Sequence, residues 1–167
     1  YKGLLGAGYK MFHEGGVFFT VRRSDKKELP ALAEKFAFLG FRLYATEGNA
    51  RVLREAGFAV NMVPKIDENS EYNSMTILET GRVQYIISTS AKGRIPARDS
   101  VRIRRRACLL GVPCLTSIDT AGALADSLMS RYNEDNTVLV DINRMQEERI
   151  QGEQVQSGRR EEHGGRY

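Results

Sequence analysis

Apolar and polar residues alternate along the chain in blocks that favour strands separated by helices. Short, almost unbroken apolar runs are typical of strands that are buried on both faces, as in a parallel sheet. Such runs predict strands at 17–21, 42–45, 58–63, 83–87 and 112–115. Residues 137–142 fit either a last strand or the start of a terminal segment.

Between these runs, apolar residues recur at the spacing of a helix that covers one face of a sheet. The first such helix carries Leu29, Leu32 and Phe36, with Ser24 or Asp25 as its predicted cap. Further helices are predicted at 50–56, near 75–78, at 98–110 and at 119–131. Strands that alternate with helices in this way predict an α/β fold, with a parallel sheet covered on both faces.

Length and composition are those of one globular domain. The 167 residues include 41% hydrophobic and 28% charged residues, and no apolar run reaches the roughly 18 residues of a membrane span. Cys108 and Cys114 are too few for a disulfide framework, so we expect two buried, reduced thiols in a cytoplasmic protein. The first residues lack a secretory pattern, and we expect a piece of a longer polypeptide. Residues 144–167 carry Gly and charge with few core-forming side chains and are predicted to be disordered.

The loops that follow the predicted strands share one kind of chemistry. In parallel sheets these loops gather at the carboxyl edge, where ligands bind. They are rich in small hydroxyl residues, lysine and one glycine, and they cover 22–26, 46–49, 64–65, 88–93 and 116–119. Helix-start N–H groups, hydroxyls and ammonium groups suit a phosphate. Each hydroxyl taken singly is also explained as a helix cap. Together, the loops predict a site for a phosphate-bearing small molecule.

Several other kinds of site are disfavoured. Gly-x-Gly-x-x-Gly and P-loop patterns are missing, as are metal-ligand spacings and a nucleophile elbow. His13 and His163 lie in Gly-flanked and polar segments, which are poor supports for a catalytic base. We therefore expect neither a metal nor a catalytic residue in this chain.

Arginines are concentrated in the predicted helix 98–110. At 100° per residue, Arg98, Arg102, Arg105 and Arg106 share one face, and a second face, expected to meet the sheet, carries Ile103, Ala107 and Leu110. The arginine face fits a solvated surface paired with local acids such as Asp99. It also fits a surface that meets acidic groups of a neighbouring domain. Nucleic-acid binding is disfavoured, because no aromatic residues interleave with the arginines.

Several segments resemble a known family. Residues 15–21 (GGVFFTV), 25–26 (DK) and 45–50 (ATEGNA) are similar to the methylglyoxal-synthase-like domain. More narrowly, they resemble the C-terminal allosteric domain of the carbamoyl-phosphate synthase large subunit. Residues 1–10 (YKGLLGAGYK) resemble the segment that leads out of the second ATP-grasp unit of that enzyme. The resemblance implies a linker at 1–15 and a regulatory domain at 16–143.

The resemblance also implies a fold, a ligand and a site. The fold is a three-layer, Rossmann-like sandwich with a five-stranded parallel sheet. The ligand is a phosphorylated effector such as UMP, IMP or phosphoribosyl pyrophosphate. Asp99 would approach the ribose or base, and Thr116 would lie near the contact with the catalytic half. The residues implied around the effector phosphate are Lys26, Thr46, Gly48, Asn49, Lys65, Ser88, Thr89 and Ser90.

Two positions depart from the family pattern, and both keep a side-chain oxygen. Asn49 stands where the family more often has Thr, and Ser88 where some members have Asn. Methylglyoxal synthases carry a Gly-Gly-Asp segment whose Asp is the catalytic base, whereas residues 66–69 here read IDEN. Synthase activity on dihydroxyacetone phosphate, with Asp67 or Asp99 as the base, is kept as the alternative.

The whole enzyme implied by the resemblance is an ATP-dependent ligase of pyrimidine and arginine biosynthesis that uses Mg or Mn. Its catalytic domains and its glutaminase small subunit would then be the protein partners of this chain. Neither a nucleic-acid nor a membrane partner is expected.

Overall fold

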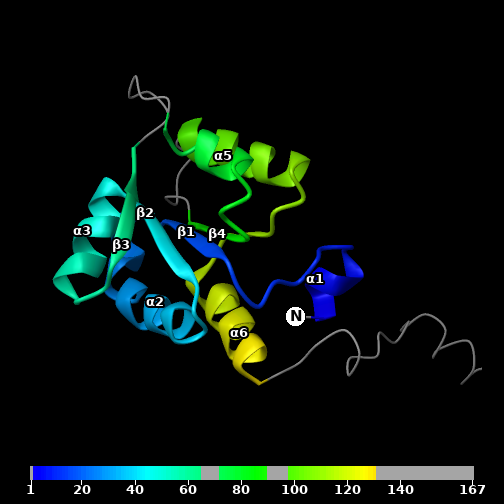
Figure 1. The fold of residues 1–167 in the computed structure, drawn as a ribbon, viewed down its shortest axis with the longest axis horizontal. Helices are drawn as coiled ribbons and strands as arrows, with labels where there is room; N and C mark the ends of the chain where they lie inside the picture. The colour runs from blue at the N-terminus through cyan, green and yellow to red at the C-terminus, as the bar shows by residue number, and fades with distance from the viewer. Residues whose placement is uncertain (1, 65–71, 90–97, 131–167) are drawn as a thin grey trace, which may run out of the picture. The chain divides into compact units, whose positions relative to one another are not determined.

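One five-stranded parallel sheet organises the computed structural model, which describes residues 2–64, 72–89 and 98–130. The strand order is β3-β2-β1-β4-β5, so the chain crosses over after β3 to reach the other side of β1 (Figure 1). All four pairings between neighbouring strands are parallel. The α/β prediction and the five strands are confirmed. The strands are β1 (Gly16–Thr20), β2 (Arg42–Thr46), β3 (Val60–Val63), β4 (Tyr85–Ser88) and β5 (Cys114–Leu115).

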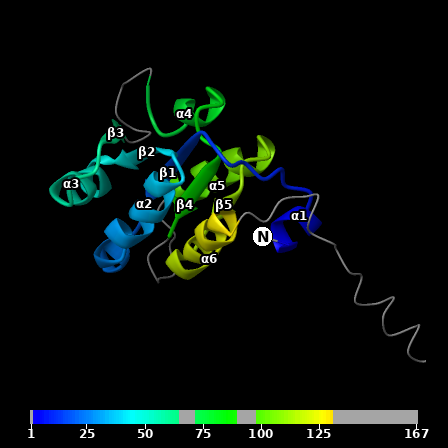
Figure 2. The same cartoon turned by 60° about the horizontal axis from the view of Figure 1, so that its bottom comes forward.

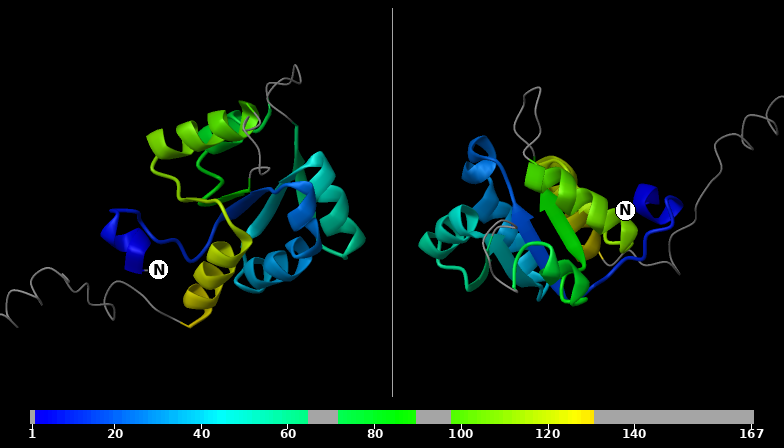
Figure 3. Two further views of the ribbon diagram at one scale, coloured as in Figure 1. Left: turned by 180° about the vertical axis from the view of Figure 1, so that it is seen from behind. Right: turned by 90° about the horizontal axis from the view of Figure 1, so that it is seen from above.

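Helices cover both faces of the sheet. Successive residues of β1 point to opposite sides, so its apolar side chains contribute to a core on each face. Val17 and Phe19 pack into one core with residues of the helices α2 (Leu29–Phe38), α3 (Glu47–Glu55) and α6 (Ile118–Met129). Phe18 lies in the other core, with residues of α4 (Thr76–Glu79) and α5 (Arg98–Leu109). Figure 2 and Figure 3 show α5 and α6 on opposite sides of the strands.

The segment after β1 differs from the sequence prediction. A 3₁₀ helix, η1 (Arg23–Lys27), precedes α2, and Glu28 occupies the cap position of α2 without a side-chain cap bond. Ser24 and Asp25 therefore do not cap α2. The helix still ends where Gly40 adopts a φ of +87°, as a glycine after a helix commonly does.

The segment that leads into β1 contains a short helix, α1 (Lys2–Gly6), which the sequence pattern did not predict. Beyond α1, the chain is tied to the sheet by Tyr85 of β4, a fully buried residue. The Tyr85 hydroxyl donates to the Phe12 carbonyl oxygen at 2.8 Å and accepts from the Phe12 N–H at 2.7 Å. Its ring packs against Phe12, Phe36 and Phe41.

Some sequence predictions fall outside the described residues. These are the strand or terminal segment at 137–142, the domain limit at 143 and the tail at 144–167. Among the residues that the structure does describe, no helix combines the length and the apolar character that crossing a bilayer requires.

Candidate functional site

Hydroxyl side chains end three neighbouring strands of the sheet. Thr20 ends β1, Thr46 ends β2 and Ser88 ends β4. Thr20 is directly paired with Ser88, and Thr46 lies one residue beyond the Phe19–Ala45 pair. The carboxyl ends of β2, β1 and β4 therefore bring three hydroxyl groups to one edge, and two of them, Thr46 and Ser88, belong to loops that the sequence analysis selected. Thr20 itself was missed, because it was read as an interior residue of a longer strand.

Lys26 and Gly48 join η1 to the start of α3. The Lys26 ammonium donates to the Gly48 carbonyl oxygen at 2.9 Å. A Cβ added to Gly48 would lie 2.9 Å from the Lys26 Nζ atom, closer than real Cβ contacts come. A glycine is therefore needed here for the ammonium to sit against the backbone of α3.

Thr46 and Asn49 form the next part of this edge. Thr46 occupies the N-cap position of α3, but its side chain makes no cap bond to the backbone. Instead, its Oγ1 accepts a 2.9 Å hydrogen bond from the Asn49 amide Nδ2. Because Asn49 uses up one acceptor site of this hydroxyl, the hydroxyl proton is left to donate elsewhere. Asn49 is only 3% exposed, and its Oδ1 has no partner among the described residues.

Ser88 is fully buried at the end of β4. Its Oγ has no hydrogen-bond partner among the described residues, whereas its carbonyl oxygen accepts from Arg104 at 3.3 Å. A buried hydroxyl without a partner costs about 1–3 kcal/mol, so this group is available to bond to a ligand. The sequence analysis assigned no role to Arg104, because the arginine face that it identified consists of other arginines of the same helix. Arg104 follows Ile103, which is buried in the same core as Ile86 of β4, and this neighbour is the sequence feature that could have placed Arg104 near that strand.

Thr89 belongs to a network around Asp25. Its Oγ1 accepts from the Arg22 backbone N–H at 3.0 Å, and its hydroxyl also bonds to the Asp25 carboxylate. The same carboxylate accepts from the Arg22 Nε and from the Ser24 hydroxyl, both at 2.8 Å. Burial alone raises the pKa of Asp25, but these hydrogen bonds and the Arg22 charge outweigh burial and lower that pKa. Asp25 is therefore an ionised anchor of the loop after β1.

The remaining predicted residues are less closely tied to this edge. Lys65 and Ser90 lie outside the described residues. Asp99 is half-buried in the first turn of α5, with no ion pair or hydrogen bond to described residues. Thr116 is exposed directly after β5. The structure thus brings together Lys26, Thr46, Gly48, Asn49, Ser88 and Thr89 at the ends of β1, β2 and β4.

The outer face of α5 differs in part from the helical-wheel prediction. Ile103 and Ala107 are buried as expected, but Leu110 lies beyond the helix and is 41% exposed. Arg106 forms a 2.6 Å ion pair with Glu79 at the end of α4, which fits the interpretation of a surface whose arginines pair with nearby acids. Cys108 is exposed, so the expectation of two buried thiols is wrong for this residue. Ile103 and Ala107 pack against the sheet, so Cys108 lies on the side of α5 that is exposed.

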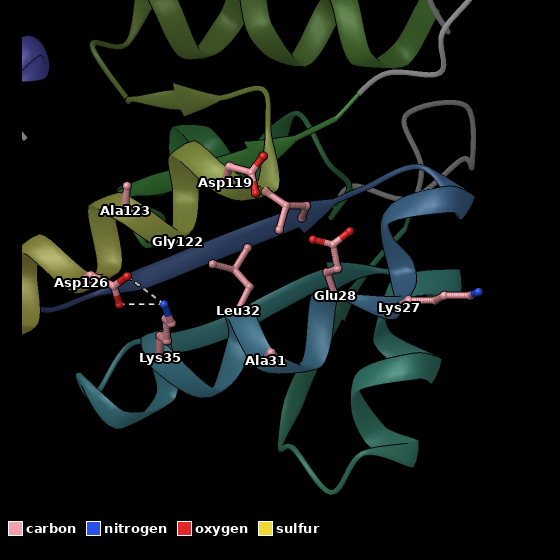
Figure 4. A pocket seen from close by; sticks show the side chains of 10 residues that line it. Lys27, Glu28, Ala31, Leu32, Lys35, Asp119, Gly122, Ala123 and Asp126 are labelled. Carbon is pink, nitrogen blue, oxygen red and sulfur yellow. Dashed lines mark hydrogen bonds and ion pairs between the residues drawn. The ribbon is translucent and has the colours of Figure 1, made fainter.

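A groove of about 560 Å³ lies between α2 and α6 and contains none of the residues predicted to bind the effector. Figure 4 shows Glu28 facing Asp119 across it, while Lys27 points away. At the other end, Lys35 holds both carboxylate oxygens of Asp126 at 2.7 and 2.9 Å. We place the candidate site at the carboxyl edge instead, because buried hydroxyl and amide oxygens without partners lie there and the groove has none of them.

The carboxyl edge gathers several kinds of hydrogen-bond donor. It combines an ammonium group, hydroxyl donors and the first turn of α3, whose N–H groups carry partial positive charge. Within residues 2–64, 72–89 and 98–130, no three His, Cys, Asp or Glu side chains are grouped to hold a metal ion. Such a set of donors suits an oxyanion.

Two comparisons with known proteins agree with this arrangement. Residues 28–116, from the cap of α2 to the residue after β5, match the family described as the MGS-like domain. The fold is similar to that of a methylglyoxal synthase from Elizabethkingia anophelis NUHP1, with a TM-score of 0.55 and 15% sequence identity. That match covers 69% of this chain and 79% of the synthase chain, and at this identity it concerns the fold alone. Since the family match spans more than half of the sequence, the chain belongs to the MGS-like domain family.

Proposed function

We propose that this chain is the regulatory domain of a carbamoyl-phosphate synthase large subunit and that it binds a phosphorylated, nucleotide-type effector. The resemblance of 1–10 and 45–50 to that subunit supports the narrower assignment within the family. The observation that carries the proposal is the buried Ser88 hydroxyl, which has no hydrogen-bond partner among the described residues and lies at the edge that also holds Lys26. The Asn49 Oδ1 also has no partner among those residues, and as an acceptor it suits a hydroxyl or N–H group of the effector and not its phosphate. A buried polar atom without a partner is uncommon in folded proteins, and a bound ligand is one explanation for it.

In the proposed mode of binding, the effector phosphate lies among the ends of β1, β2 and β4. Lys26 supplies a full positive charge, and the hydroxyl groups of Thr46 and Ser88 donate to phosphate oxygens. The first turn of α3 adds its N–H groups. Ribose or base would extend towards the half-buried Asp99. Binding would then change how this domain packs on the catalytic domains, with a coupling of about 1–3 kcal/mol.

Calorimetry of the purified chain tests effector binding directly. UMP, IMP and phosphoribosyl pyrophosphate are titrated separately, and uridine is the matched control because it lacks the phosphate. We expect saturable heat and a raised melting temperature with at least one phosphorylated compound and neither with uridine. No heat and no thermal shift at millimolar ligand would contradict the proposal.

Regulation itself is tested with the whole enzyme. Carbamoyl phosphate formation is measured at several ATP concentrations, with and without the effector that binds the isolated chain. We expect the apparent ATP affinity or the turnover to change by about 5–150-fold. An effector that binds but leaves both unchanged would separate the binding function from the regulatory one.

The alternative function is a lyase of the methylglyoxal synthase type. The likeness in fold to a solved methylglyoxal synthase favours it. Its base would be Asp67, which lies outside the described residues, or Asp99 of α5. A colorimetric methylglyoxal assay with dihydroxyacetone phosphate decides between the two functions, since a purely regulatory domain produces no methylglyoxal.

A further inference from the structure

A second cavity lies at the opposite edge of the sheet, where the strands begin. It has a volume of about 450 Å³ and is bounded by the segment before β1 and by the turns before β2 and β4. Its lining includes Glu14, Arg42 and Arg82. The volume lies within the range of small-molecule sites. This cavity shares no residue with the candidate effector site at the carboxyl edge.

The backbone around the amino-edge cavity is held by the side chain of Gln84. Its Oε1 accepts from the Gly16 N–H at 2.6 Å, and its Nε2 donates to the Gly81 carbonyl oxygen at 2.8 Å. Gly15 has a φ of +121°, and a Cβ on it would overlap the Gln84 side chain. The turn before β4 and the start of β1 are therefore fixed to each other, which gives the cavity a preformed wall.

Two arginines approach the amino-edge cavity from either side of β1. Arg42 begins β2 and is in register with Gly16 of β1. On the other side of β1, the Gln84 N–H donates to the Gly16 carbonyl oxygen, so Arg82 lies two residues before this contact in the turn that leads to β4. Neighbouring strands are about 4.8 Å apart, so the two backbones are roughly 10 Å apart. Both arginines are exposed, and neither forms one of the ion pairs within the described residues, although the charge of Arg82 acts on the nearby Tyr72.

We propose that the amino-edge cavity binds a small dicarboxylate, with one carboxylate on Arg42 and the other on Arg82. A guanidinium fork matches a carboxylate in bidentate geometry. Because the two arginines belong to segments on either side of β1, each can hold one of two acidic groups joined by a short linker. Glu14 is the acid that lines this cavity, so the lining keeps one net positive charge from two arginines and one glutamate. Glu14 opposes anion binding, and its removal strengthens that binding.

Malonate and succinate are the probes, titrated into ¹⁵N-labelled protein at low ionic strength with chloride held constant. We expect saturable amide shifts at Gly15 and Gly81, with dissociation constants in the millimolar range or tighter. Arg42→Ala and Arg82→Ala each weaken binding at least tenfold, and Glu14→Gln tightens it several-fold. Lys27→Ala is the matched control, because it removes the charge of an exposed residue that does not line this cavity, and it leaves dicarboxylate binding unchanged.

The folded state of each variant is checked by its melting temperature. If an alanine variant does not fold, Arg42→Lys and Arg82→Lys replace it, since they keep the charge and lose the fork, and they weaken binding several-fold. Shifts that never saturate, or equal affinity in a double arginine variant, overturn the proposal. Two other results also overturn it: weaker binding in Glu14→Gln, which would indicate a cationic or zwitterionic ligand, and inorganic phosphate binding at this cavity as tightly as malonate.

Discussion

The Lys26 ammonium lies 2.9 Å from the Gly48 carbonyl oxygen, so a residue of the loop after β1 is held against the first turn of α3. An ammonium group has three donors, and this bond uses one of them. The other two can turn towards the hydroxyl groups at the strand ends. Lys26 is thereby positioned before any ligand arrives, which lowers the conformational entropy lost on binding.

Replacing Lys26 by Ala should weaken binding of the phosphorylated effector by at least tenfold, because a charge-assisted hydrogen bond to the phosphate is lost. The control is Lys27→Ala, which removes the same charge from the neighbouring, exposed residue that points away from the groove between α2 and α6 (Figure 4). Calorimetry with the tightest-binding effector measures both variants. Equal loss in the two variants would indicate a general effect of net charge and not a contact made by Lys26.

Gly48→Ala should fold but bind the effector less well. The added methyl meets the end of a flexible side chain, so the Lys26 ammonium moves away and the protein adapts. The control is Gly122→Ala in α6, where a new Cβ meets nothing within 4 Å. This change should leave binding intact and stabilise the helix by about 0.5–1 kcal/mol. Thermal unfolding and calorimetry check both variants, and unchanged binding by Gly48→Ala would argue against a ligand-binding role for Lys26.

Asp25→Asn should lower stability near neutral pH and have a smaller effect in acid. The pKa of Asp25 is lowered in the folded state, so its ionised form stabilises the protein above the ordinary value of 3.8. That stabilisation is lost as the pH falls through the folded-state pKa. Urea unfolding should show a loss of about 1–2 kcal/mol at pH 7 that shrinks towards pH 2.

Asp119→Asn is the matched control for Asp25→Asn, because Asp119 is exposed and makes no ion pair or hydrogen bond through its side chain to the described residues. It should change stability by about 0.5 kcal/mol or less at either pH. A loss for Asp25→Asn that is the same at pH 7 and pH 2 would mean that the charge of Asp25 is unimportant.

Tyr85→Phe should cost about 1–3 kcal/mol, because it leaves both the N–H and the carbonyl oxygen of Phe12 without their partner. The core is otherwise unchanged, since the ring is kept. Tyr9→Phe is the control: Tyr9 is half-buried, and its hydroxyl has no partner among the described residues. Urea unfolding measures both. Hydrogen exchange should also be faster at Phe12 in the Tyr85 variant, and unaltered protection there would contradict the clamp.

The two thiols should react at different rates. Cys108 is exposed, whereas burial raises the pKa of Cys114, only partly offset by the Arg104 charge. The thiolate is the reactive form. With iodoacetamide at pH 8 we expect Cys108 to be modified at least tenfold faster, as measured by peptide mass spectrometry. Cys108→Ala provides the control, in which the fast phase disappears, and two equal rates would contradict the assigned burial.

Local patterns were sufficient to predict the architecture. The buried runs around Phe18, Tyr44 and Ile86 are short and apolar on both sides, which is a property of each segment alone. Gly40 and Gly57 mark the ends of α2 and α3 because both positions require a positive φ, which glycine adopts at little cost. The site residues at strand ends followed from topology, since parallel strands bring their carboxyl ends to one edge.

The partners chosen by each polar side chain could not be read from the sequence. The Thr46 hydroxyl could cap α3, but it accepts a hydrogen bond from the Asn49 side chain instead. The Thr89 hydroxyl accepts from the backbone N–H of Arg22, which lies 67 residues earlier in the sequence. Arg104 was given no role from the sequence, yet it reaches the carbonyl oxygen of Ser88. Periodicity depends on neighbours along the chain, so the helices and strands are visible in it. A hydrogen bond is decided by whichever donor and acceptor the folded chain brings within about 3 Å, and that distance exists only once the layers have packed.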